Sequence, residues 1–430
     1  MRSRFLAALS AFAFVCISAA SAQPITPPPA AEVAPDTPAS TLLPALIAHS
    51  RHLATLQDGR LSGEGADFLR AMIGESHFLL IGEDHGNAGV ADFATALWRE
   101  AHAQGYQYGA IEVDPYIAEA ANRELAEGGA EAWAAYLARR NSAGGAPFLN
   151  WDAETRYAEQ IVRDSDGRAP ALWGLDQVFI GAGSVRLREI AENARNAEAR
   201  ALAAALANQA NAGALDAFAR LDGAQLQRLR SLLGDRRDAR YATMTDQMIV
   251  SHRIYQPFVT GGGEANLANA EREHLMKNLF LEAYAAAEEA DRAPPRVVFK
   301  FGANHMYRGA TPTWVQGLGG FVTEFAAARG QRAAALAVMC GPGGAVASLG
   351  GPPTPCAEPM AATYPFLTEH IDPQQVTIFD LRVWRLRPRR WAHLPAEMQQ
   401  LLGSFDALVF VPDGAAAEFL PGLSLPTPPQ

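Results

Sequence analysis

Cysteine is scarce in this chain, and several signatures of common protein classes are missing from it. Only three cysteines occur among 430 residues, and the lack of any Cys-x-x-Cys pair argues against a cysteine-based zinc site. Beyond position 22 no apolar run reaches about 18 residues, so we expect no transmembrane segment in the mature chain. Gly-x-Ser-x-Gly and Gly-x-x-x-x-Gly-Lys-Ser/Thr are also missing, which disfavours an ordinary serine hydrolase and a P-loop enzyme.

Acidic residues outnumber basic ones. The sequence has 46 aspartates and glutamates against 36 lysines and arginines, and its formal charge is −10. A nucleic-acid partner requires clustered positive charge, whereas the arginines within 382–390 form only a local group typical of a solvated loop flank. We therefore expect a small-molecule substrate and no nucleic acid. No pattern in the sequence indicates an oligomeric state.

The amino-terminal segment, 1–22, has the pattern of a secretory signal peptide. Two arginines form a positive start, residues 6–18 form a short apolar run, and Ala20-Ser-Ala22 supplies a small-x-small cleavage site. We therefore expect a periplasmic or secreted protein. Residues 23–40 are rich in proline and alanine and lack periodicity, which is typical of a linker.

Export would place the remaining cysteines in an oxidising compartment. Cys340 and Cys356 stand at the two ends of a loop rich in glycine and proline. They form one disulfide in our interpretation, and the alternative is two unpaired thiols in a flexible loop. Cys16 lies inside the signal segment and belongs to neither alternative.

Residues 41–425 are interpreted as a single α/β domain. Between the first two strand-length apolar runs, Val90, Phe93, Leu97 and Ala101 recur at helical spacing. Strand, helix and strand within about 35 residues indicate a βαβ unit. We expect a doubly wound α/β fold with a mixed, mostly parallel sheet. The candidate strands are 77–82, 107–113, 170–175, 296–302, 332–339, 376–383 and 406–411.

One long stretch interrupts this alternation of strands and helices. Residues 184–290 contain no convincing strand and are dense in alanine, leucine, glutamate and arginine. We expect three or four helices there, broken near glycines. This insertion forms a cap over a site at the sheet end, or it covers one face of the sheet, and both can hold.

The most informative feature is a short motif that occurs twice. Gly82-Glu-Asp-His85 and Gly302-Ala-Asn-His305 each follow an apolar run of strand length. Such runs are typical of parallel strands buried on both faces, and ligands gather at the carboxyl ends of these strands. If the two strands share one sheet, His85 and His305 can meet there although they are far apart in the sequence.

Charged side chains follow the other candidate strands as well. Glu112 stands out because it occurs within an otherwise apolar strand, and carboxylates are rarely buried unless they are paired or used. Asp114 precedes Pro115 and is a candidate either for the site or for a helix cap, and the same choice applies to Asp176. The candidate catalytic residues are Glu83, His85, Glu112, His305 and Arg308, and the candidate substrate-binding residues are Asp84, Asp114 and Asp176.

Two kinds of chemistry fit these side chains. In the first, His85 is a general base for water, Glu112 orients it, and His305 with Arg308 stabilises an oxyanion. In the second, Glu83, His85, Glu112 and His305 hold a divalent metal that lowers the pKa of a bound water. Two histidines with carboxylates suit Zn, Mn, Co or Fe equally, so the sequence selects no metal.

Several of these segments together resemble the erythromycin-esterase-like and ChaN-like superfamily, which includes the Tiki proteins. The resemblance covers roughly residues 65–412. It rests on Gly82-Glu83-Asp84-His85-Gly86, Glu112, Trp173-Gly174-Leu175-Asp176, Arg272-Glu273-His-Leu-Met276-Lys-Asn278, Gly302-Ala-Asn-His305, Phe379-Asp380-Leu381-Arg382 and Phe405-Asp406-Ala407.

The resemblance implies three functions. The first is an exported hydrolase that cleaves an ester or amide of a small molecule, with Glu83, His85, Glu112 and His305 at active-site positions. The second motif has a single histidine, a form closer to ChaN-like members, which implies a periplasmic protein that binds haem, iron or another metal without catalysis. The third is a metal-dependent peptidase of the Tiki kind.

Overall fold

The computed structural model describes residues 39–140, 143–165, 167–168, 170–211, 215–234, 236–261, 265–348, 351–385, 394 and 396–423. The chain divides into two units, Met1–Leu43 and Pro44–Gln430, and the site lies in the second. The expected signal peptide and nearly all of the expected linker lie outside the described residues. Among the helices that are described, none is both long enough and apolar enough to cross a membrane.

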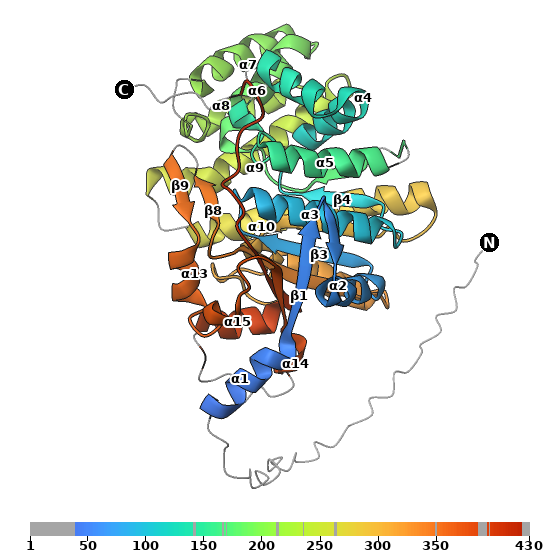
Figure 1. The fold of residues 1–430 in the computed structure, drawn as a ribbon. Helices are drawn as coiled ribbons and strands as arrows, with labels where there is room; N and C mark the ends of the chain where they lie inside the picture. The colour runs from blue at the N-terminus through green and yellow to red at the C-terminus, as the bar shows by residue number, and fades with distance from the viewer. Residues whose placement is uncertain are drawn as a thin grey trace, which may run out of the picture. The chain divides into compact units, whose positions relative to one another are not determined.

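The second unit contains a sheet of nine strands in the part of the chain that the structure describes (Figure 1). Its order is β2-β1-β10-β11-β7-β3-β6-β4-β5, in which β11 to β5 run parallel and β10, β1 and β2 add an antiparallel edge. The expected mixed, mostly parallel sheet is confirmed. The strands are β1 (Arg51–Gln57), β2 (Arg60–Ser62), β3 (Phe78–Glu83), β4 (Tyr108–Ile111), β5 (Leu172–Gly174), β6 (Val297–Gly302), β7 (Ala333–Cys340), β10 (Val376–Asp380) and β11 (Ala407–Val411).

Helices connect these strands and cover the sheet. The helices are α1 (Ala39–Ser50), α2 (Glu64–Gly74), α3 (Ala88–His102), α4 (Pro115–Arg140), α5 (Asp152–Asp164), α6 (Gly183–Asn193), α7 (Ala197–Ala210), α8 (Gly223–Leu232), α9 (Ala239–Thr260), α10 (Ala265–Asp291), α11 (Ala303–Met306), α12 (Leu318–Ala328), α13 (Ala357–Thr363), α14 (Arg382–Arg385) and α15 (Ala396–Ser404). Short 3₁₀ helices span Ala143–Gly145, Ile180–Ala182, Phe218–Arg220 and Thr368–His370.

Both faces of the parallel strands are buried, which explains their nearly uninterrupted apolar sequences. Leu79 and Ile81 of β3 belong to a core that they share with α3 and α5. Phe78 of the same strand packs against Phe280 of α10 and Phe325 of α12. Because alternate residues of a strand point to opposite faces, these contacts put helices on both sides of the sheet, as a doubly wound fold requires.

All seven candidate strand segments are strands, with ends that differ by at most three residues from those expected. The sequence analysis missed β1 and β2, in which exposed polar residues such as Thr55, Gln57 and Arg60 interrupt any apolar run, and also β8 (Ala345–Ser348) and β9 (Gly351–Pro355). Three of the five residues of β9 are prolines, which a central strand does not tolerate, and this strand pairs with β8 in a separate two-stranded sheet.

Within the described residues of the predicted helical insertion there are five α-helices, α6 to α10, one or two more than expected. The break between α6 and α7 has no glycine and falls at Asn196, whose side chain caps α7. Figure 1 shows α6, α7 and α8 grouped together, and α6 to α9 share a hydrophobic core of their own. In contrast, α10 packs on the sheet through Phe280. The insertion therefore includes a sheet-covering helix and a separate helical cluster.

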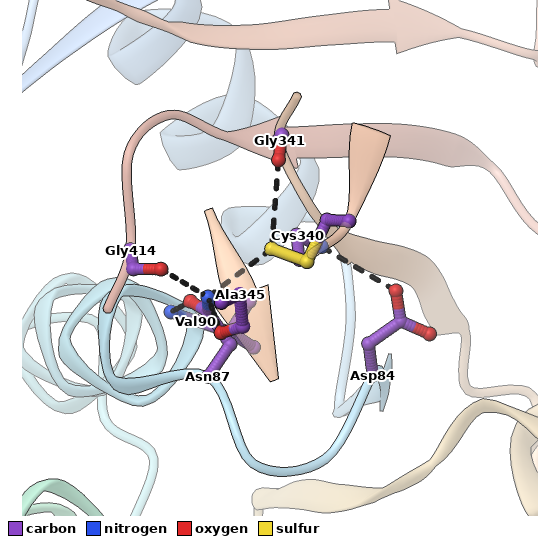
Figure 2. Close-up of a disulfide and its surroundings, with 8 residues drawn as sticks. Asp84, Asn87, Val90, Cys340, Gly341, Ala345 and Gly414 are labelled. Atoms are coloured by element: carbon purple, nitrogen blue, oxygen red, sulfur yellow. Dashed lines mark hydrogen bonds between the residues drawn. A yellow bond between two sulfur atoms is a disulfide. The ribbon is translucent and has the colours of Figure 1, made fainter. Parts of the chain in front are cut away.

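Cys340 and Cys356 are joined by a disulfide, with their Cα atoms 6.0 Å apart (Figure 2). Cys340 is the last residue of β7, and Cys356 directly follows β9. The bond therefore closes the loop that contains strands β8 and β9.

Candidate active site

The two Gly-x-x-His segments lie side by side because their strands are neighbours. Glu83, the last residue of β3, is in register with Gly302, the last residue of β6. Gly302 leaves room for the histidine of the first segment, since a Cβ at this position would lie 2.6 Å from His85 Nε2. The carboxyl ends of β3 and β6 therefore bring the two segments to one place on the sheet edge.

Glu112 links the two histidines. It directly follows β4, the other neighbour of β6, and its side chain is buried. One carboxylate oxygen accepts a hydrogen bond of 2.7 Å from the Gly302 amide and lies 3.2 Å from His85 Nε2. The other oxygen lies 3.3 Å from His305 Nε2 and accepts a hydrogen bond of 2.7 Å from Arg272. Each oxygen of Glu112 thus faces two donors.

A second carboxylate stands on the far side of each imidazole. His85 Nδ1 lies 3.0 Å from Glu83 Oε1, and His305 Nδ1 lies 2.6 Å from Glu273 Oε1. Glu273 comes from α10 and also accepts a hydrogen bond of 2.7 Å from the Leu318 amide at the start of α12. Both ring nitrogens of both histidines therefore face carboxylate oxygens, a setting in which a doubly protonated imidazolium is favoured.

Two cations, one buried and one partly exposed, balance this concentration of acids. Lys300, within β6, reaches Glu83 Oε1 at 2.6 Å and both carboxylate oxygens of Glu154 at 2.7–2.8 Å. Arg272, from α10, binds Asp176 through two nitrogens at 2.9 and 2.5 Å and reaches Glu112 as well. Pairing of this kind is what makes buried charges tolerable.

Electrostatics in the cluster favour the charged forms. Burial lowers the pKa of His85, but the carboxylates of Glu112 and Glu83 outweigh it and raise the pKa to about 10. His305 follows the same balance of burial against Glu112, and its pKa rises to about 9. Burial raises the pKa of Glu112, yet the two histidines hold it well below its usual range. At neutral pH both histidines are therefore imidazolium ions.

The two acids that bind Lys300 have pKa values shifted in opposite directions. Burial raises the pKa of Glu83, but Lys300 and His85 outweigh that effect and lower it. The pKa of Glu154 stays raised, because burial outweighs Lys300 and the negative charge of Glu83 adds to it. Of these two carboxylates, Glu83 is the one whose anionic form is favoured by its neighbours, and it lies beside His85.

His85 is the member of the cluster most open to solvent among the side chains that contact one another here. Its side chain is 28% exposed, against 12% for His305 and 2% for Glu83. Phe148 stacks on the imidazole with ring centroids 4.0 Å apart, on a left-handed backbone with φ of 63°. Beside them lies a cavity of about 20 Å³, lined among others by Glu83, Tyr157 and Lys300, which has room for one water molecule.

The four candidate metal ligands do not form a metal site as they are arranged. Among the described residues, no group of three or more histidine, cysteine, aspartate or glutamate side chains has the geometry to hold an ion. Glu112 lies between the two imidazoles instead of beside them, and Lys300 already binds Glu83. This donor set suits proton transfer better than metal ligation.

Two of the remaining candidate residues serve as structural partners. Asp114 caps α4, accepting hydrogen bonds of 2.9 and 3.0 Å from the amides of Tyr116 and Ile117, so the helix-cap alternative describes it. Asp176 caps none of the helices that the structure describes and instead binds Arg272. Asp84 is exposed, and its carboxylate accepts a hydrogen bond of 3.4 Å from the Cys340 amide.

Arg308 lies away from the cluster, contrary to the expectation that it stabilises an oxyanion. Its guanidinium pairs with Asp406 and donates a hydrogen bond of 2.9 Å to the carbonyl of Ala333. Ala333 begins β7 and pairs in register with Phe78 at the start of β3. That position is five residues, or about 16 Å, below Glu83 along the strand. Arg308 therefore supports the opposite end of the sheet.

The sequence analysis did not select four charged residues of the cluster as site residues: Glu154, Arg272, Glu273 and Lys300. Lys300 carried the same signal as Glu112, a charged residue within an apolar strand. Glu154 lies on the buried face of α5 with Tyr157, Ala158 and Ile161. These four residues recur at helical spacing, so the sequence shows an acid on an otherwise apolar helix face, which is a usable signal for a buried charge. Arg272 and Glu273 belonged to the resemblance but had no assigned role.

No family model matches the chain, and no curated protein sequence matches it. Several solved structures, in contrast, match the chain. A histidine-to-asparagine mutant of erythromycin esterase EreC, in its open conformation, aligns with a TM-score of 0.59 at 14% identity, covering 87% of this chain and 100% of that one. The chain has the erythromycin-esterase-like fold.

Two further structures share the erythromycin-esterase-like fold. A succinoglycan biosynthesis protein aligns with a TM-score of 0.59 at 13% identity, over 90% of this chain and 100% of that one. A Bacillus cereus protein aligns with a TM-score of 0.54 at 13% identity, over 89% and 99%. The fold expected from the resemblance is confirmed, and at these identities the likeness extends to the fold alone.

Proposed function

We propose that this protein is an exported hydrolase that cleaves an ester or amide of a small molecule, with water activated at His85. The observation that carries the proposal is the arrangement of His85, which is partly open to solvent and held from both sides by Glu83 and Glu112. The shared fold with an erythromycin esterase agrees with this class of reaction. The signal-like pattern of the segment 1–22 supports export.

His85 has the geometry of a proton-transfer residue. Glu83 accepts the hydrogen bond from Nδ1 and is itself fixed by Lys300, so the ring orientation is set. Nε2 faces a Glu112 oxygen at 3.2 Å, and a substrate or water molecule exchanges a proton with Nε2 by displacing this contact. In the free protein Nε2 carries a proton, because the pKa of His85 is raised to about 10. The base form of His85 therefore becomes more abundant as the pH rises toward that value.

Arg272 takes the role that the sequence analysis gave to Arg308. Its guanidinium reaches Glu112 at 2.7 Å, and its side chain is partly exposed beside the two histidines. A fixed cation next to the proton-transfer group stabilises negative charge on a carbonyl oxygen as water adds to it. Asp176 fixes the orientation of Arg272 through two hydrogen bonds.

The experiment that tests the proposal is a panel of small esters and amides assayed with the wild-type protein and with His85→Gln. His102→Gln is the matched control, since His102 lies on α3 and bonds the carbonyl of Tyr106 away from the cluster. We expect turnover in the wild type and the control and a loss of roughly 100-fold or more in His85→Gln. Equal turnover in all three proteins would contradict the proposal.

A further inference from the structure

The residues on either side of His85 are held by a part of the chain outside the charged cluster. The Asp84 amide donates a hydrogen bond of 3.1 Å to the carbonyl of Val338, and its carboxylate accepts one from Cys340. The carbonyl of Gly86 accepts hydrogen bonds of 2.8 Å from the amides of Ala347 and Ala417. His85 is thus fixed through both of its chain neighbours.

The side chain of Asn87, in the loop that carries His85, contacts Cys340, Ala345 and Gly414 (Figure 2). It is buried, and its side-chain oxygen caps α3 by accepting a hydrogen bond of 2.9 Å from Val90. Its side-chain nitrogen donates to the carbonyls of Ala345 and Gly414 at 2.9 and 2.7 Å and lies 3.2 Å from Cys340 Sγ. One amide group therefore joins the His85 loop, the disulfide and the carboxyl-terminal segment.

Close packing gives this contact little freedom. Gly86 has a φ of +83°, and a Cβ there would lie 2.8 Å from the carbonyl oxygen of Ala347. A Cβ on Gly344 would lie 2.5 Å from Cys340 Sγ. The hairpin of β8 and β9 therefore contacts the loop 84–87 through backbone atoms of Ala347 and Gly86. A shift of the hairpin requires a shift of this loop.

Ala345 and Ala347 lie between the two cysteines, so the disulfide closes the segment that grips the loop. We propose that the described residues of this segment, 340–348 and 351–356, form a redox-dependent clamp that keeps His85 in place. The oxidised form holds Gly86 and Asn87, and the reduced form releases them. Its effect on turnover rests on the proposed function, whereas its effect on the loop does not.

Reduction of the clamp is a simple two-electron step. A dithiol reductant supplies two electrons and two protons, the Sγ–Sγ bond breaks, and both cysteines become thiols while the reductant leaves as its own disulfide. Both sulfur-bearing residues are buried. The exchange therefore follows opening of the hairpin, and the clamp persists in an oxidising compartment.

Amide hydrogen exchange of oxidised and dithiol-reduced protein tests the clamp without any substrate. Two thiols per chain confirm full reduction. We expect exchange at Ala88 and Val90, on the His85 side, to become roughly tenfold faster or more, with no change in β3. Unchanged exchange at Ala88 and Val90 would overturn the proposal, even if the hairpin exchanges faster. Fast exchange in β3 as well would also overturn it, because the disulfide would then support the whole fold.

Two variants separate the clamp from the catalytic proposal. Asn87→Ala removes the hydrogen bonds of the Asn87 side chain while both cysteines remain. Asn196→Ala is the matched control, since Asn196 also caps a helix and binds a distant carbonyl. We expect faster exchange at Ala88 and a shifted His85 ring resonance at fixed pH in Asn87→Ala only. The same spectra in both variants would overturn the clamp. Failure of every ester to react would contradict the hydrolase and leave this result standing.

Discussion

Gly302 and His85 are packed so closely that a Cβ at position 302 would lie 2.6 Å from the imidazole Nε2. The Gly302 amide also donates a hydrogen bond of 2.7 Å to the same oxygen of Glu112 that faces His85. One backbone position therefore sets the place of the histidine and of its carboxylate. The histidine of the first Gly-x-x-His motif, His85, therefore fits only because the second motif begins with a glycine, Gly302.

Gly302→Ala should displace His85 and lower kcat/KM for the proposed substrate by about 100-fold, the usual effect of misplacing a catalytic group by about 1 Å. Kinetics on the best ester of the panel measure this. Gly309→Ala is the matched control, because a Cβ there lies within 4 Å of no atom belonging to the residues that the structure describes. An equal loss in both variants, or no loss in Gly302→Ala, would show that the close contact does not position His85.

Lys300→Met should destabilise the protein by about 3–5 kcal/mol, because it leaves two buried carboxylates without their shared cation. Urea denaturation gives the free energy of unfolding. Adding Glu154→Gln to the same chain removes one of the two unpaired charges, so the double variant should recover part of the loss. If Lys300→Met were as stable as the wild type, Lys300 would not be compensating the charges of Glu83 and Glu154.

Stability should fall as the pH rises through the alkaline range. The pKa values of His85 and His305 are raised to about 10 and about 9, so the folded protein holds these protons more tightly than the unfolded chain does. Their stabilising effect is complete below about pH 6.5 and is lost as the pH approaches 9–10. Tm measured between pH 6 and 10.5 follows this loss.

The variant that checks this assignment is His305→Gln, which should flatten part of the decline in Tm, since one of the two raised groups is gone. His102→Gln, outside the cluster, should keep the wild-type slope. An unchanged slope in His305→Gln would remove His305 as a cause of the pH dependence.

Arg272 and Arg308 should differ in what their loss affects. Arg272→Lys breaks the two-point contact with Asp176 and should lower kcat by about 100-fold, since lysine does not reproduce a planar guanidinium. Arg308→Lys should leave kcat within about threefold and lower the free energy of unfolding by about 1–3 kcal/mol, because Arg308 holds Asp406 at the far end of the sheet. Steady-state kinetics and urea denaturation distinguish the two. The reverse pattern would return the oxyanion role to Arg308.

Much of the fold was readable because parallel strands buried on both faces leave long apolar runs. Strands β3 and β6 are visible in this way, and the glycine near the end of each strand with the histidine beyond it places His85 and His305 at one sheet edge. The hairpin of β8 and β9 was not visible, because proline-rich and partly exposed strands leave no apolar run. Its position over the His85 loop depends on tertiary contacts.

Only some of the charged residues of the site could be predicted from the sequence. Glu112 was found because an acid in an apolar strand is unusual, and Lys300 carried that signal without being selected. Glu273 was out of reach as a partner of His305, because α10 precedes β6 by a turn whose path the sequence does not specify. Arg308 follows its histidine by three residues and was assigned to the site, but its side chain reaches the amino-terminal end of β7 instead.

The pH dependence of hydrolysis tests the central claim most directly, since that claim is water activation at His85. With the best substrate of the panel, kcat/KM is measured from pH 6 to 10.5 for the wild type, His85→Gln and His102→Gln. We expect it to rise with pH toward an apparent pKa near 10 in the wild type and in His102→Gln, because the pKa of His85 is raised to about 10. The residual rate of His85→Gln should lack this rise. A profile that is flat, or the same rise in His85→Gln, would contradict the account.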